Sequence, residues 1–96
     1  MRLYRSAAQA GHAEAQCNLG SLYWLGEGVV KYAVEANRWF ALSAEGGHAK
    51  AQFNLGVHFA QGLGVALDLA QAAHWLRAAA SRGHVKAAEA LVIFGL

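Results

Sequence analysis

Five histidines are the residues of this sequence best suited to bind a metal ion or to transfer a proton. Three of them, His12, His48 and His84, are spaced 36 residues apart, and each follows a glycine. This constant phase places each one at the same corner of successive structural units. Zinc ligands must converge to within about 2.0–2.1 Å of one ion, whereas packed helix layers lie on the order of 10 Å apart. We therefore predict that these three histidines are turn or helix-capping residues.

The remaining candidates for chemistry are equally isolated. His74 falls on the outward face of its predicted helix, and His58 lies near an edge between units, where a half-buried packing role is favoured over a binding role. The loops GEGV and GLGV lack the Gly-Lys-Ser/Thr of a phosphate-binding loop. No base lies at a useful spacing from the serines, which are Ser6, Ser21, Ser43 and Ser81. We predict no catalytic, cofactor-binding or metal site, and therefore no enzyme.

The composition favours a small helical domain, because 56% of the 96 residues are hydrophobic, Ala is abundant and Pro is absent. The net charge of +2 is mild and the basic residues are dispersed, which predicts no nucleic-acid binding. The apolar run ALVIFGL is too short to cross a bilayer, so no membrane insertion is expected. No signal-peptide pattern opens the chain and Cys17 is the single cysteine, which predicts a cytoplasmic location if the chain is complete as written.

An internal repeat explains the histidine spacing. When residues 11–46 are laid over residues 47–82 without a gap, 14 of the 36 positions are identical. Each copy holds two helical patterns separated by glycines. A helix pair cannot bury its apolar face alone, so neighbouring pairs should stack. We predict an all-α fold, a right-handed α-solenoid of antiparallel helix pairs with about two and a half 36-residue repeats.

This pattern predicts the elements and their boundaries. The chain should form one repeat domain over residues 1–96, divided into a half repeat (1–10), two repeats (11–46 and 47–82) and a second half repeat (83–96). Helices are expected over residues 1–10, 13–25, 32–45, 49–61, 68–82 and 85–95. Gly20 and Gly56 fall inside helices, where glycine costs up to about 1 kcal/mol relative to Ala. We therefore predict a close contact at each with the partner helix of the same repeat.

The motif residues resemble those of the Sel-one-like repeat (SLR) family, which is related to the tetratricopeptide repeats. The first copy reads AQCNLGSLYWLGEGV and then EANRWFALSAEGG; the second reads AQFNLGVHFAQGLGV and then QAAHWLRAAASRG. Val30 and Ala66 stand where the family often has Pro, and Tyr32 stands where the second copy keeps Asp68. The resemblance implies a non-enzymatic adaptor or scaffold, in bacterial signalling, envelope or host-interaction complexes or in eukaryotic membrane-associated quality control. It also implies that the first helix of each repeat lines a concave face.

On that concave face we expect a protein partner, a peptide or a helix, to bind. The expected contact residues are Glu14, Asn18, Ser21, Trp24, Leu25, Lys50, Phe53, Asn54, Val57 and Lys86. Trp24 stands out because its counterpart in the second repeat is Ala60. It is either an aromatic anchor for a partner or a packing residue between adjacent first helices, and packing is favoured for Cys17 and Phe53.

The terminal helices suggest an alternative function. Each lacks a helix to cover it, and the run ALVIFGL in the last helix is apolar where a solenoid normally ends in a polar cap. The chain would then be a structural repeat fragment that self-associates, for example as a homodimer through its terminal helices, without a ligand of its own.

Overall fold

The computed structural model describes residues 11–26 and 32–96, and this part of the chain contains five α-helices. They are α2 (Ala13–Leu25), α3 (Ala33–Glu45), α4 (Ala49–Gln61), α5 (Leu69–Ser81) and α6 (Val85–Ile93). Each begins and ends within about two residues of the predicted helix, which is the usual uncertainty of helix ends. The helix and half repeat predicted over residues 1–10 lie outside the described residues, and the division into repeats stays a prediction.

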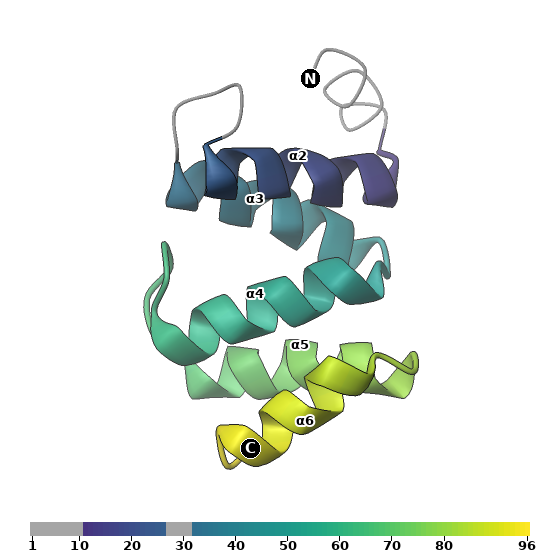
Figure 1. Cartoon of the computed structure of the whole chain (residues 1–96), viewed down its shortest axis with the longest axis vertical. Helices are drawn as coiled ribbons and strands as arrows, with labels where there is room; N and C mark the ends of the chain where they lie inside the picture. Colours follow the sequence, from purple (N-terminus) through teal and green to yellow (C-terminus); the bar gives the residue numbers. More distant parts are fainter. Residues whose placement is uncertain (1–10, 27–31) are drawn as a thin grey trace.

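The helices are arranged as stacked antiparallel pairs (Figure 1). α2 packs against α3 and α4 packs against α5, while α3 and α4 join the two pairs. α6 begins a third pair by packing on α5 and touching α4. The first helices of the repeats, α2, α4 and α6, form one layer, and the second helices, α3 and α5, form the other. The prediction of an all-α solenoid is confirmed.

Two glycines inside helices allow the helices of each pair to approach closely. A Cβ atom added to Gly20 would lie 2.9 Å from the ring of Phe40 on α3, and one added to Gly56 would lie 2.7 Å from Cγ of Leu76 on α5. Real Cβ contacts are longer, so a methyl group at either place would force its neighbour to move. The predicted contact with the partner helix of the same repeat is confirmed at both positions.

The three phase-locked histidines begin the three first helices. His12, His48 and His84 are the N-cap residues of α2, α4 and α6. The imidazole of His84 accepts a hydrogen bond from the backbone N–H of Ala87 at 3.1 Å, whereas the side chains of His12 and His48 make no capping hydrogen bond. Their predicted position at turns and caps is confirmed, and each side chain stands at the start of a separate helix.

The interior is built largely from small side chains. One buried cluster joins α2, α3 and α4 and consists of Cys17, Ala36, Phe40, Ala44, Ala51 and Leu55. A second joins α5 and α6 and consists of Leu76, Ala79, Ala87 and Ala90. Alanine at most of these positions lets the helices pack closely, so that a few large side chains are sufficient to fill the core.

Candidate interaction surface

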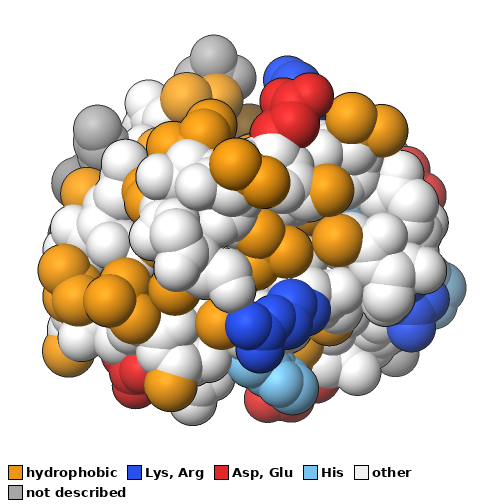
Figure 2. Space-filling model, turned by 90° about the horizontal axis from the view of Figure 1, so that it is seen from below, with side chains coloured by type: hydrophobic (Ala, Val, Ile, Leu, Met, Phe, Trp, Pro, Cys, Tyr) orange, Lys and Arg blue, Asp and Glu red, His pale blue; other side chains and the backbone are white. Residues whose placement is uncertain are grey.

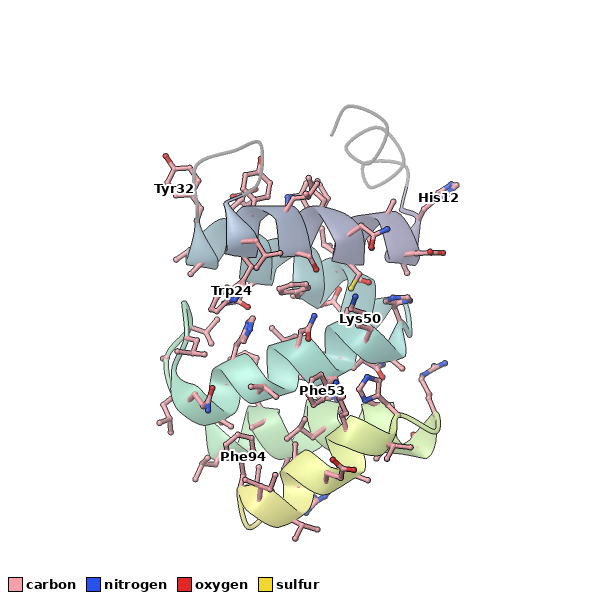
Figure 3. All side chains as sticks on the ribbon, in the orientation of Figure 1. His12, Trp24, Tyr32, Lys50, Phe53 and Phe94 are labelled. Carbon is pink, nitrogen blue, oxygen red and sulfur yellow. The ribbon has the colours of Figure 1, made fainter. Side chains whose placement is uncertain are left out.

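All ten residues predicted to contact a partner lie on the layer of first helices. We call the accessible side of α2, α4 and α6 the first-helix face. Its predicted residues are Glu14, Asn18, Ser21, Trp24 and Leu25 on α2, Lys50, Phe53, Asn54 and Val57 on α4, and Lys86 on α6. Glu14, Leu25, Lys50 and Lys86 are exposed, and the other six are partly buried. In Figure 3, Trp24 and Lys50 lie between α2 and α4, and Phe53 lies between α4 and α6.

The polar side chains in the middle of this face are not used by the fold. Asn18 and Asn54 occupy equivalent positions in α2 and α4, both are partly exposed, and Ser21 lies one turn after Asn18. None of the three makes a side-chain hydrogen bond to another residue of the described chain. A primary amide carries two donor hydrogens and an acceptor oxygen. The two asparagines are therefore free to bind the backbone of another chain.

Between α2 and α4, an aromatic stack fills the boundary of the first two repeats. The ring of Trp24 stacks on that of His58, with centroids 4.1 Å apart and planes 19° apart. Phe40 meets His58 edge-on at 5.6 Å. Trp24 is partly buried and also packs against the first core cluster. One face of the indole thus already contacts another side chain of the same chain, as in the packing alternative. Cys17, a member of that core cluster, is completely buried.

His58 is a buried structural histidine. Only 7% of the residue is exposed, so it is more buried than the half-buried position predicted for it. Asn37 Nδ2 donates to the carbonyl oxygen of Leu63 at 2.7 Å, which leaves Asn37 Oδ1 as the acceptor for His58 Nδ1 at 2.5 Å. The proton of the neutral ring therefore sits on Nδ1. Burial lowers the pKa of His58 to about 4, so the ring is neutral at pH 7.

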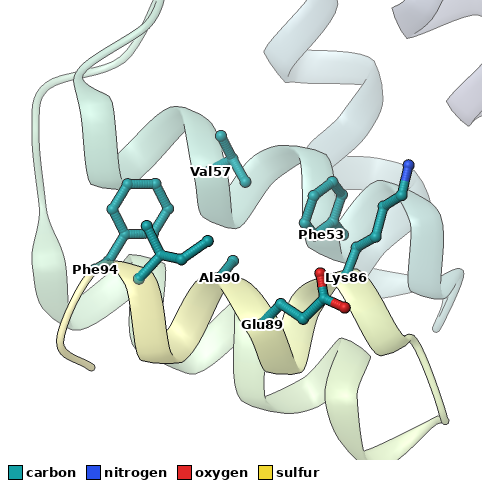
Figure 4. A pocket seen from close by; sticks show the side chains of 7 residues that line it. Phe53, Val57, Lys86, Glu89, Ala90 and Phe94 are labelled. Carbon is teal, nitrogen blue, oxygen red and sulfur yellow. The ribbon is translucent and has the colours of Figure 1, made fainter.

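Between α4 and α6, a groove with a volume of about 280 Å³ is open to solvent. It is lined by Phe53, Val57, Lys86, Glu89, Ala90, Ile93 and Phe94. Phe53 and Phe94 lie at its two ends, with Val57 and Ala90 between them (Figure 4). Three of these residues belong to the predicted set, namely Phe53, Val57 and Lys86.

Four lining residues are outside the predicted set, and of these Phe94 is the one that lies beyond α6. It follows α6, and its N–H donates to the carbonyl of Ala90 at 2.9 Å. The chain then turns back, because Leu96 N–H donates to the carbonyl of Leu91 at 2.8 Å and Arg77 Nη2 donates to the carbonyl of Leu96 at 2.9 Å. These bonds fix the backbone next to Phe94. The available signal was the repeat itself, since Phe94 is 36 residues after His58.

Other polar side chains in the structure serve the backbone. Ser43 Oγ donates to the carbonyl of Ala13 at 2.5 Å, and Ser81 Oγ donates to that of Ala78 at 2.7 Å. Asp68 borders a hollow of about 430 Å³ at the start of α5, but its Oδ1 accepts from the N–H of Gln71 at 3.0 Å and caps the helix. Across residues 11–26 and 32–96, no three His, Cys, Asp or Glu side chains are placed to hold a metal ion.

No helix in the described ranges is both long enough and apolar enough to cross a membrane. The fold defines a class of protein, a helical-repeat solenoid with an open face of first helices. A model of the Sel1 repeat matches residues 1–12, 13–48 and 49–84. The chain belongs to the Sel1 repeat family, whose members are generally non-catalytic scaffolds for protein–protein interaction.

Solved structures of bacterial proteins share the fold. A Sel1 repeat protein from Oxalobacter formigenes is 38% identical with a TM-score of 0.92, over 94% of this chain and 68% of that chain. A protective antigen present in uropathogenic Escherichia coli strains, which displays an SLR fold, is 38% identical with a TM-score of 0.85, over 88% of this chain and 18% of that chain.

An uncharacterized protein of Neisseria meningitidis serogroup B is also similar in sequence, 52% identical over 29 residues. The match covers 30% of this chain and 6% of the Neisseria protein, so this chain matches only a small part of that relative.

Proposed function

We propose that this chain is a non-enzymatic protein-interaction module that binds a peptide or a helix on the first-helix face. The observation that carries the proposal is the pair of asparagines, Asn18 and Asn54, at equivalent positions and without hydrogen-bond partners in the described chain. The apolar groove between α4 and α6 is lined partly by α4, the helix that also carries Asn54. The face therefore combines amides that can bind a peptide backbone with a place for an apolar side chain. Membership of a scaffold family supports the same function.

A peptide selection tests this proposal. Random dodecapeptides displayed on phage would be selected on the immobilised chain, and the enriched peptides would be synthesised for affinity measurement by fluorescence polarisation. Each peptide would be measured on the parent chain and on the double variant Asn18→Ala, Asn54→Ala, which removes the free amides but favours helix formation. A matched control, Gln71→Ala with His74→Ala, changes two exposed side chains of α5 instead.

We expect the asparagine variant to weaken binding at least tenfold, which corresponds to about 1.4 kcal/mol, and the α5 control to change it less than twofold. Circular dichroism of both variants should match the parent. Peptides that bind both variants as well as the parent, or a selection that enriches none, would rule out this face as the working surface.

The exposed apolar side chains of α6 favour a second candidate function, self-association through this helix. Val85, Val92 and Ile93 are 69%, 82% and 78% exposed, and hydrophobic side chains are scattered over this end of the molecule (Figure 2). Val92 occupies the position of Gly20 and Gly56, so a helix cannot approach α6 as closely as α3 and α5 approach their partners. A second copy of the chain would instead cover α6 through these side chains.

Sedimentation equilibrium across the micromolar range tests self-association. The parent chain should show a mass that rises with concentration toward twice that of one chain. Val92→Lys should remain a single chain at all concentrations, because it places a charge on the proposed contact. A parent mass of 10.2 kDa throughout that range would exclude this function.

A further inference from the structure

The groove between α4 and α6 is related by the repeat to the gap that Trp24 fills. Adding 36 to each residue number carries α2 onto α4 and the first nine residues of α4 onto α6. By this rule His58 corresponds to Phe94, so both boundaries carry a ring at equivalent repeat positions, His58 within α4 and Phe94 directly after α6. Trp24, however, corresponds to Ala60. The second boundary thus keeps the ring that receives an indole and lacks the indole itself.

The size and lining of the groove suit one large aromatic side chain. Its volume of about 280 Å³ lies just below the roughly 300–1,000 Å³ of pockets that hold whole small-molecule ligands. Phe53 is held in place at one end, where its ring stacks on His84 with centroids 4.7 Å apart. Aromatic rings at both ends allow offset or edge-on contacts with a third ring placed between them.

Two charged side chains line the same groove and complement the polar parts of such a residue. Lys86 and Glu89 are exposed, and neither forms an ion pair within the described ranges. In Figure 4, Lys86 extends alongside Phe53. A carboxylate only accepts hydrogen bonds and an ammonium only donates them. Glu89 can therefore accept the N–H of an indole, and Lys86 can donate to the carbonyl or carboxylate oxygens of the chain that carries it.

We propose that this groove holds a tryptophan side chain of the peptide bound by the first-helix face, an inference that rests on the function proposed above. The indole lies between Phe53 and Phe94, as the indole of Trp24 lies against His58. The groove thereby gives the module its sequence preference. The asparagines bind backbone groups, which every peptide has, whereas the groove distinguishes one side chain from another.

The phage selection already described also tests this inference through the sequences it enriches. We expect one tryptophan at a constant position in the enriched peptides, and a loss of at least tenfold in affinity when it is replaced by leucine. Two protein variants make the location specific. Ile93→Lys and Val92→Lys change neighbouring, similarly exposed residues of α6 in the same way, but only Ile93 lines the groove.

Ile93→Lys should weaken binding of the tryptophan peptide at least tenfold, and Val92→Lys should change it less than twofold. Because both side chains are exposed, both variants should fold like the parent.

The possible failures are distinguishable. Peptides that need Asn18 and Asn54 but share no tryptophan, or that respond equally to the two lysine variants, would overturn this inference and leave the proposed function intact. The absence of any peptide that depends on the asparagines would overturn both. A tryptophan peptide that loses affinity with the asparagine variant and with Ile93→Lys, but not with Val92→Lys, would support both.

Discussion

The two boundaries between repeats use equivalent positions in opposite ways. At the first, Trp24 stacks on His58 and the gap between α2 and α4 holds an indole. At the second, Ala60 and Phe94 occupy those positions, and a groove of about 280 Å³ remains. The helix that completes each boundary differs too, because α4 has 13 residues and α6 has 9. The second boundary therefore differs from the first in two ways, by the exchange of Trp24 for Ala60 and by the shorter helix that completes it.

The polar contacts differ between the two boundaries as well. Asn37 bonds to His58 and to the carbonyl of Leu63, and so ties α3, α4 and the loop after α4 together. Its counterpart in the second repeat is Ala73, which offers no hydrogen bond. A buried network specifies one arrangement when every member is satisfied. The first boundary is therefore fixed by bonds that Asn37 makes within the buried layer, whereas at the second the corresponding alanine makes none and the bond from Arg77 to the carbonyl of Leu96 lies at the exposed end of α6.

The largest expected difference between the boundaries is a dependence on pH. In the folded chain His58 stays neutral down to about pH 4, whereas in the unfolded chain it takes up a proton below about pH 6.5. The unfolded state binds more protons between these values, so the free energy of unfolding falls as pH decreases from about 6.5 to about 4. The expected loss from this residue is roughly 3 kcal/mol, and it does not grow further below about pH 4.

Urea unfolding of the parent and of His58→Phe between pH 7 and pH 4 measures this effect. The variant places at position 58 the phenylalanine found at position 94. It should be less stable at pH 7, because the buried Oδ1 of Asn37 loses the hydrogen bond from His58. Its stability should nevertheless fall much less over this pH range. Parallel pH profiles for the two proteins would contradict the assignment of the effect to His58.

A smaller difference is expected at the two helix-pair contacts. Gly56→Ala places a methyl group 2.7 Å from Cγ of Leu76, a fully buried side chain, and 3.2 Å from its backbone nitrogen, which cannot move without shifting α5. Overpacking of this kind costs about 1–3 kcal/mol, partly offset by the better helix propensity of Ala. We expect a net loss of about 1–2 kcal/mol in the free energy of unfolding.

Gly20→Ala should cost slightly less than Gly56→Ala, because its shortest contact, with the ring edge of Phe40, is 2.9 Å rather than 2.7 Å; a backbone atom lies close in both cases, here the oxygen of Ala36 at 3.1 Å. Thermal unfolding of both variants, followed at 222 nm, gives the comparison. A greater loss at Gly20 than at Gly56 would show that the first pair is the more tightly packed.

The smallest expected difference concerns the start of each second helix. Asp68 caps α5 through its bond to Gln71, whereas Tyr32, the N-cap of α3, makes no side-chain hydrogen bond there. Asp68→Ala should lower the free energy of unfolding by about 1 kcal/mol, and Tyr32→Asp should raise it by up to about 1 kcal/mol. Urea unfolding at pH 7 measures both, and a stabilising effect of Asp68→Ala would exclude the capping role.

The repeat pattern predicted most of the fold. The 36-residue period located the helices to within about two residues, and the placement of Gly20 and Gly56 inside helices identified the closest contacts, because only a packing requirement explains glycine there. The same period put the three N-cap histidines at equivalent corners. Such features are local or periodic, so a single sequence contains them in full.

The pairings across the boundary of the repeats were less predictable. His58 was expected near an edge between units, but its bond to Asn37 joins residues 21 positions apart, and the burial that neutralises it comes from three helices. Phe94 was missed because its place in the groove depends on the turn after α6 and on the bond from Arg77 to the end of the chain.

The sequence by itself determined that this protein is a stack of helix pairs of the Sel1 type, because the spacing of small and apolar residues fixes which faces must be buried. Only the tertiary structure decided which gap between first helices is filled and which is open. Whether such a gap is open depends on the volumes of the side chains that separate helices contribute to it. Those side chains meet only once the helices are packed.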